Sequence, residues 1–114
     1  MRRRIKSYNP DVVVSLHPLM TNFPVTFCCK RSGETGKFFP VFTVVTDLGS
    51  AHCLWFANGV DRIFIASDQI QAIAKSKGKV PDEKLIQSGL PIRYDFAVQA
   101  DKLGDRLSKQ GKNY

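Results

Sequence analysis

The chain has 114 residues, of which 43% are hydrophobic, 24% charged and 11% aromatic. This fits one globular domain and excludes a two-domain enzyme, a collagen and a disordered chain. The formal net charge is +7, yet residues 1–10 alone hold four basic and no acidic side chains, residues 101–114 hold four basic and two acidic ones, and the middle is nearly neutral. The positive charge therefore belongs to the two ends.

Four short apolar runs predict β-strands. They are Asp11–Leu16, Val41–Thr46, Arg62–Ala66 and the weaker Lys84–Ser88. The first two are rich in β-branched residues without polar alternation, which is typical of strands buried on both faces of a sheet.

Two helices are predicted between these strands. The first begins with Asn22 as its cap and ends near Arg31, before Gly33. The second has Ser67 as its N-cap and ends before Gly78. The alternation of strands and helices predicts a partial Rossmann-like α/β domain with an open parallel sheet and flanking helices.

The start of the chain lacks a feature that such folds usually have. A doubly wound sheet usually opens with a Gly-rich turn that binds phosphate, whereas this chain opens with a basic segment. We therefore expect a piece of a larger protein: a basic stub (1–10), an incomplete Rossmann-like domain (11–96) and a basic tail or linker (97–114), in which a short helix is one alternative. We expect neither a membrane span nor a secretion signal.

Ligands of open α/β sheets bind beyond the carboxyl ends of the strands, which directs attention to the loops that follow the predicted strands. His17 either serves a ligand or only hydrogen-bonds a neighbouring loop, and Asp47 is either functional or a turn former before Gly49. Ser67 is favoured as a helix cap over a site residue. Arg93 follows the fourth strand in a Gly-Leu-Pro-Ile-Arg loop.

The aromatic segment Cys53–Phe56 has two interpretations. Trp55 belongs either to a small hydrophobic cluster or to an exposed shelf for an apolar ligand or a membrane. The basic residues of segment 1–10 would attract anionic lipid in the second case. The two histidines and three cysteines lack the spacing of a metal site or a disulfide scaffold, so we expect neither a metal nor a cofactor, and a reducing compartment.

Five motifs in order carry a resemblance that covers about residues 8–96. They are Asn9–Met20, Val44–Leu48, Cys53–Phe56, Asp61–Ser67 and Ser88–Arg93. Together they resemble the later part of the N-terminal domain of the monogalactosyldiacylglycerol synthase family. They resemble less closely the bacterial diacylglycerol glucosyltransferases and the lipid-linked N-acetylglucosaminyltransferase of peptidoglycan synthesis.

The resemblance implies half of a two-domain GT-B glycosyltransferase that transfers galactose from UDP-galactose to diacylglycerol with inversion. It implies a peripheral protein of the plastid or chloroplast envelope, with diacylglycerol and an anionic membrane surface as partners and no nucleic acid. The family's Gly-rich loop with its histidine base has no match here, nor has its nucleotide-binding domain. The 114-residue chain is therefore expected to be inactive alone, with no catalytic residue of its own.

Four positions take roles from the resemblance. His17 would order its loop or line the acceptor site, and Asp47 would hydrogen-bond across the interdomain cleft. Trp55 would face the acceptor lipid or the membrane, and Arg93 would contact the donor diphosphate with its guanidinium fork.

A different class of function stays open beside this one. The basic segment 1–10 is also compatible with a module that binds anionic membranes or nucleic acid without catalysis. The nearly neutral middle and the lack of a familiar nucleic-acid-binding motif argue against nucleic acid.

Overall fold

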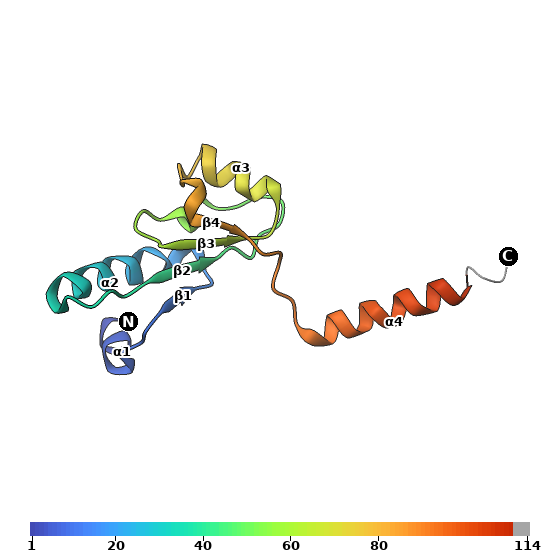
Figure 1. Ribbon diagram of the computed structural model, residues 1–114, viewed down its shortest axis with the longest axis horizontal. Helices are drawn as coiled ribbons and strands as arrows, with labels where there is room; N and C mark the ends of the chain where they lie inside the picture. The colour runs from blue at the N-terminus through green and yellow to red at the C-terminus, as the bar shows by residue number, and fades with distance from the viewer. Residues whose placement is uncertain (111–114) are drawn as a thin grey trace.

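A parallel sheet of four strands forms the centre of the molecule, for which a computed structural model describes residues 1–110. The strands are β1 (Val13–Ser15), β2 (Val41–Val44), β3 (Arg62–Ile65) and β4 (Leu85–Gln87). They lie in the order β1-β2-β3-β4, and the register pairs Val13 with Val41, Thr43 with Ile63 and Ile65 with Gln87 (Figure 1). Each strand lies within a predicted run, which confirms the Rossmann-like parallel α/β fold.

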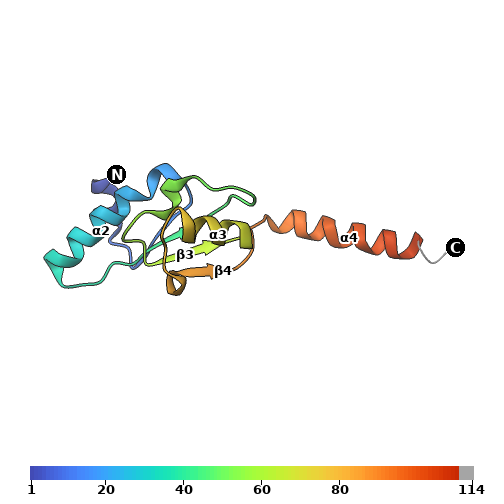
Figure 2. The same ribbon diagram turned by 90° about the horizontal axis from the view of Figure 1, so that it is seen from above.

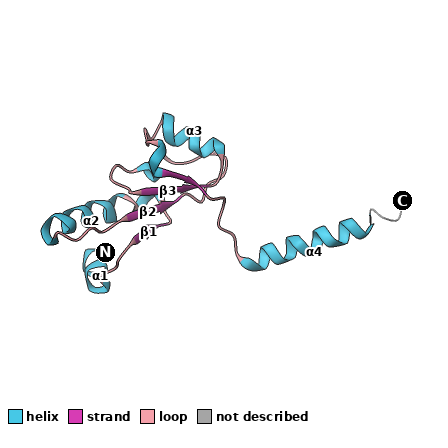
Figure 3. Ribbon diagram, in the orientation of Figure 1, coloured by secondary structure: helices cyan, strands magenta, loops and turns pink. Residues whose placement is uncertain are grey.

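The hydrophobic core lies on one face of this sheet. That face is covered by helix α2 (Asn22–Thr35), the 3₁₀ turn η2 (Cys53–Phe56) and helix α3 (Asp68–Ser76). Figure 3 shows these helices beside the strands. Their buried side chains form a single cluster with those of the strands. The cluster consists of Val25, Cys28, Phe39, Val41, Val45, Trp55, Phe56, Val60, Ile63, Ile65, Ile70 and Ala74.

The opposite face of the sheet is open in the described residues, so the expectation of strands buried on both faces is wrong. Val14 at the centre of β1 is 49% exposed, and Phe42 and Phe64 meet edge to face on the same side, with their ring centroids 6.0 Å apart. The cause is the connectivity. Each connection leads from one strand to the next neighbour in the same direction, and right-handed crossovers then all pass over the same face.

Helix α2 is longer than the sequence suggested. Gly33 lies inside it, and the helix ends where Gly36 adopts the left-handed conformation (φ 70°) and donates its N–H to the Ser32 carbonyl. A glycine in this conformation, rather than any glycine, is what ends a helix. At the other end Thr21, not Asn22, is the capping residue. Helix α3 confirms its prediction, with Ser67 as the N-cap.

A helix lies near each end of the described residues. Segment 1–10 contains α1 (Arg2–Tyr8), which has no buried residue. The predicted tail or linker belongs to a longer helix, α4 (Tyr94–Gln110), which includes Gly104 and extends away from the sheet (Figures 1 and 2). The predicted tail or linker, in which a short helix was one alternative, is helical from residue 97 to residue 110, because the spacing of Phe96, Leu103 and Leu107 sustains one helical face. Its last four residues, 111–114, lie outside the described part. None of the described helices has the length and hydropathy needed to cross a bilayer.

Candidate functional site

The loops that follow β1, β2 and β3 lie at the carboxyl edge of the sheet, since all strands run in the same direction. The turn after β1 is the 3₁₀ turn η1 (Pro18–Met20), and it packs against η2, which follows β2. The loops that carry His17 and Trp55 are therefore neighbours, as the sheet topology predicts.

Asp47 and Trp55 meet directly within this edge. The indole Nε1–H of Trp55 donates to the Asp47 Oδ2 atom at 2.8 Å. Trp55 is only 2% exposed and belongs to the core, so the cluster interpretation is correct and the exposed shelf is wrong. A large ring in a loop is buried here because the loop folds back over the covered face of the sheet, where the polar end of the indole finds a carboxylate.

The loop Thr46–His52 surrounds a shallow hollow in the protein surface. Its wall is tied to the next loop, because the Ser67 hydroxyl donates to the Leu48 carbonyl at 2.7 Å. The Ser67 hydroxyl oxygen also accepts the Ile70 N–H at 3.4 Å, as the cap of α3. Ser67 thus caps a helix and also joins the loop around the hollow to the loop after β3. The cap was predicted. The hydrogen bond between the two loops has no local sequence signal, because it depends on a contact between segments apart in the chain.

His17 orders its own loop, as one of its predicted roles requires. Its Nδ1 atom accepts the Leu19 N–H at 3.2 Å, which leaves Nε2 as the protonated, donating nitrogen of a neutral ring. The hydroxyls of Ser15 and Thr21 both lie within hydrogen-bond distance of the His17 carbonyl oxygen, at 3.2 and 3.1 Å. In this tautomer the exposed ring offers a hydrogen-bond donor rather than a base.

His52 repeats this arrangement and was missed as a site residue. Its Nδ1 atom accepts the Leu54 N–H at 3.2 Å, and the exposed ring borders the hollow. The local signal is shared with His17, because in each case a histidine comes directly before a 3₁₀ turn and a leucine stands two residues later. The carboxyl edge therefore has two ordered imidazoles rather than one.

Arg93 is not gathered with the other predicted site residues. It is exposed just before α4, after the chain has left the sheet (Figure 1). Within residues 1–110 its side chain makes no hydrogen bond or ion pair with His17, Asp47 or Trp55. Its position follows from the extended segment that separates it from β4.

The cysteines add no reactive group to the edge beyond Cys53, which is exposed. Cys28 lies on the buried face of α2. Burial raises the pKa of its thiol, an effect partly offset by Arg31. A buried thiol of raised pKa is a small apolar side chain rather than a nucleophile. The described residues contain no cluster of three or more possible metal ligands.

A parallel sheet with covering helices and ligand-facing loops at its carboxyl edge defines a Rossmann-like α/β half-domain. The model of the monogalactosyldiacylglycerol (MGDG) synthase family matches residues 1–92. The chain belongs to this family.

Two named relatives are similar over most of the chain. A probable chloroplastic monogalactosyldiacylglycerol synthase 2 from Oryza sativa subsp. indica is 38% identical over 107 residues, which are 93% of this chain and 22% of the relative. A processive diacylglycerol beta-glucosyltransferase from Bacillus cereus (strain 03BB102) is 32% identical over 95 residues, 83% of this chain and 22% of the relative. The chain thus spans about a fifth of the length of these relatives.

Proposed function

We propose that the chain is the acceptor side of a GT-B glycosyltransferase that transfers galactose from UDP-galactose to diacylglycerol with inversion. Its family is one of diacylglycerol glycosyltransferases, and the finer choice of galactose follows the rice relative rather than the bacterial one. Transfer would require groups that lie outside these 114 residues, namely a base and a nucleotide-binding domain, so the chain alone would transfer no sugar.

One observation carries the proposal: within the residues that the family model matches, the loops after β1 and β2 lie together at one edge of the sheet. His17 and Asp47 follow neighbouring strands, and Trp55 fixes the carboxylate of Asp47 at 2.8 Å. Fixed hydrogen-bonding groups at the carboxyl edge of an α/β sheet are what a bound hydroxyl compound or a facing domain requires.

Each edge residue has a role in this proposal. The Oδ1 atom of Asp47 makes no hydrogen bond within residues 1–110 and is available to accept one from the acceptor hydroxyl or a facing domain. His17 donates from Nε2 and lines the acceptor site. Trp55 acts through Asp47 and not by touching lipid. Arg93 would reach the donor diphosphate only in the presence of the nucleotide-binding half.

Membrane attachment and location are further parts of the proposal. The basic residues of α1 and the exposed Leu16, Leu19 and Met20 near it would contact an anionic bilayer peripherally. The plastid envelope is the proposed location, since the rice relative is named as chloroplastic.

A chimera tests the proposal. The matching segment of the rice relative is replaced by this chain, and galactolipid formation from UDP-galactose and diacylglycerol is measured. We expect activity in the chimera and none from the 114-residue chain alone. Asp47→Ala in the chimera should reduce kcat/KM by about tenfold or more. The control Asp82→Ala, which removes an exposed carboxylate paired with Lys75, should change it by less than about twofold.

The competing function, a basic membrane module without catalysis, makes a different prediction. It predicts that vesicles recruit the chain according to their charge alone, whereas an acceptor domain should be recruited more strongly when diacylglycerol is added at constant charge. An inactive chimera together with charge-only recruitment would favour the module and contradict the proposal.

A further inference from the structure

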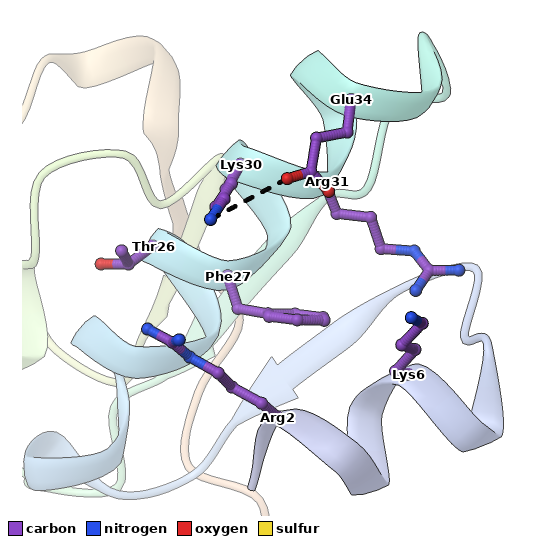
Figure 4. Close-up of a pocket in the computed structure, with 7 residues that line it drawn as sticks. All are labelled: Arg2, Lys6, Thr26, Phe27, Lys30, Arg31 and Glu34. Carbon is purple, nitrogen blue, oxygen red and sulfur yellow. Dashed lines mark ion pairs between the residues drawn. The ribbon is translucent and has the colours of Figure 1, made fainter.

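A hollow between helices α1 and α2 contains charged side chains that do not converge on one point. It is lined by Arg2, Lys6, Thr26, Phe27, Lys30, Arg31 and Glu34. Figure 4 shows that its four cationic side chains end on opposite sides of the Phe27 ring. Fixed polar groups meet instead at the carboxyl edge, around the hollow formed by Thr46–His52. The contacts that hold this loop in place therefore bear on function.

The loop Thr46–His52 depends on side chains for its position. Just before it, the Val45 N–H donates to the Phe64 carbonyl at 2.9 Å, and at its end the Trp55 N–H donates to the His52 carbonyl at 3.1 Å. Within residues 1–110, no backbone–backbone hydrogen bond involves residues 46–51. A loop without such bonds opens easily unless side chains fix it.

Two side-chain hydrogen bonds fix this loop, and both act on Asp47. The Trp55 indole holds one oxygen of the Asp47 carboxylate at 2.8 Å. The Ser67 hydroxyl donates at 2.7 Å to the carbonyl of Leu48, the residue directly after Asp47. The first bond fixes the side chain of Asp47 and the second fixes the backbone next to it. Together they set the direction of the Asp47 Oδ1 atom.

The Ser67 hydroxyl makes two different hydrogen bonds at once. It donates its hydrogen to the Leu48 carbonyl, while its oxygen accepts the Ile70 N–H at the start of α3. A helix cap needs only an acceptor, and aspartate serves there as well as serine. The bond to Leu48, at 2.7 Å, is also much shorter than the 3.4 Å bond of the cap. The hydroxyl is therefore better placed for the loop than for the helix.

We propose that Ser67 is a positioning residue for the transfer reaction, which acts through the Leu48 carbonyl to direct Asp47 toward the acceptor hydroxyl. The inference rests on the proposed function, in which the Asp47 Oδ1 atom accepts a hydrogen bond. Ser67 itself lies in the next loop, at the start of α3, and needs no contact with the lipid. A displacement of about 1 Å in an active site can lower a rate by about a hundredfold, so one bond between two loops is enough to affect the reaction.

Substitutions at Ser67 separate this role from the helix cap. Ser67→Asp keeps an acceptor for the Ile70 N–H but cannot donate to the Leu48 carbonyl, because an ionised carboxylate only accepts. Ser67→Ala loses both bonds, and Ser67→Thr keeps both. Gln69→Glu is the matched charge control, since it adds the same negative charge in the first turn of α3 and leaves the Ser67 hydroxyl in place. Urea denaturation should show a clearly lower midpoint only for Ser67→Ala, which lacks the cap.

The first measurement follows the bond between Trp55 and Asp47 in the full chain. Trp55 is the one tryptophan of the sequence, so its indole N–H gives a single NMR signal, and the exchange of that proton with water reports on the bond. We expect exchange to be faster by about threefold or more in Ser67→Asp and Ser67→Ala, because the loop loses a hydrogen bond. Ser67→Thr and Gln69→Glu should stay within about twofold. Unchanged exchange in Ser67→Asp would overturn the inference.

The second measurement uses the chimera with the rice relative. Ser67→Asp should lower kcat for galactolipid formation by about fivefold or more and leave the KM for UDP-galactose unchanged, since the nucleotide binds to another domain. Ser67→Thr should retain the activity. A residue that only caps α3 predicts full activity in Ser67→Asp and a loss in Ser67→Ala alone, and that result would overturn the inference. An inactive chimera with the unchanged chain would instead contradict the proposed function, and the indole signal would still decide whether Ser67 holds Asp47.

Discussion

The two faces of the sheet are built from the same strands and from similar residues, yet only one of them is a core. On the covered face Ile65 of β3 is 1% exposed, whereas Ile86 of β4, on the opposite face, is 38% exposed. The difference shows that an apolar side chain in a strand does not decide its own burial. Burial depends on which face the connections cross, and here all of them cross the same face.

The largest expected effect on stability is the difference between alanine substitutions at Ile65 and at Ile86. Ile65→Ala should lower the free energy of unfolding by about 2–5 kcal/mol, because it leaves a cavity under α3. Ile86→Ala should lower it by about 1 kcal/mol or less, since no layer covers that face. Urea denaturation followed by circular dichroism measures both, and Ile65→Val, with an expected loss of about 0.5–1.5 kcal/mol, replaces the alanine variant if that variant does not fold. Equal losses for Ile65→Ala and Ile86→Ala would mean that the open face is covered in solution.

The second effect concerns the hydrogen bond at the rim of the covered face. Trp55→Phe and Asp47→Ala should each destabilise the chain, and a double-mutant cycle should give a coupling of about 1–2 kcal/mol for the Nε1–H bond to the Asp47 carboxylate. We expect a smaller coupling free energy than for a fully buried hydrogen bond to a charged group, because Asp47 is only half-buried. Additive losses, measured by denaturation, would show that the bond is not formed in solution.

The third prediction is that replacing a buried threonine by valine changes stability in opposite directions at Thr43 and at Thr21. The Thr43 hydroxyl is buried without a partner in the described residues, so Thr43→Val should leave stability unchanged or raise it by about 1 kcal/mol. Thr21→Val should lower it by about 1–2 kcal/mol, since the Thr21 hydroxyl bonds the His17 carbonyl at 3.1 Å. Both are read from the shift of the urea midpoint. A loss in Thr43→Val would reveal a partner for that hydroxyl, such as a buried water.

The smallest effect is a pH dependence of stability caused by Cys28, on the buried face of α2. Burial raises the pKa of this thiol in the folded state, so the neutral thiol contributes stability that is fully present below the unfolded pKa of about 8.5 and is lost as the pH rises toward the folded value. The free energy of unfolding should therefore fall above about pH 8.5, and less so in Cys28→Ala. An alkylating reagent should label Cys29 and Cys53, which are exposed, well before Cys28. Rapid labelling of all three would contradict the burial.

Much of the fold could be predicted because its signals are local. The four apolar runs and the Ser67 cap each lie within a few residues, and local pattern is enough to place them. The end of α2 was misplaced because two glycines compete there, and only the backbone conformation distinguishes Gly36 from Gly33. Among the site residues, loop ordering by His17 was one role that the family resemblance implied, whereas the direction in which Trp55 points had no local signal.

By itself, the amino-acid sequence determined the strand content, the parallel α/β class and the family of this protein, because periodicity and ordered motifs survive without coordinates. The tertiary structure alone decided that the core is one-sided and that Trp55 holds Asp47. The physical reason is that these properties depend on contacts between segments far apart in the chain. Such contacts depend on which face the connecting segments cross, which no local pattern specifies.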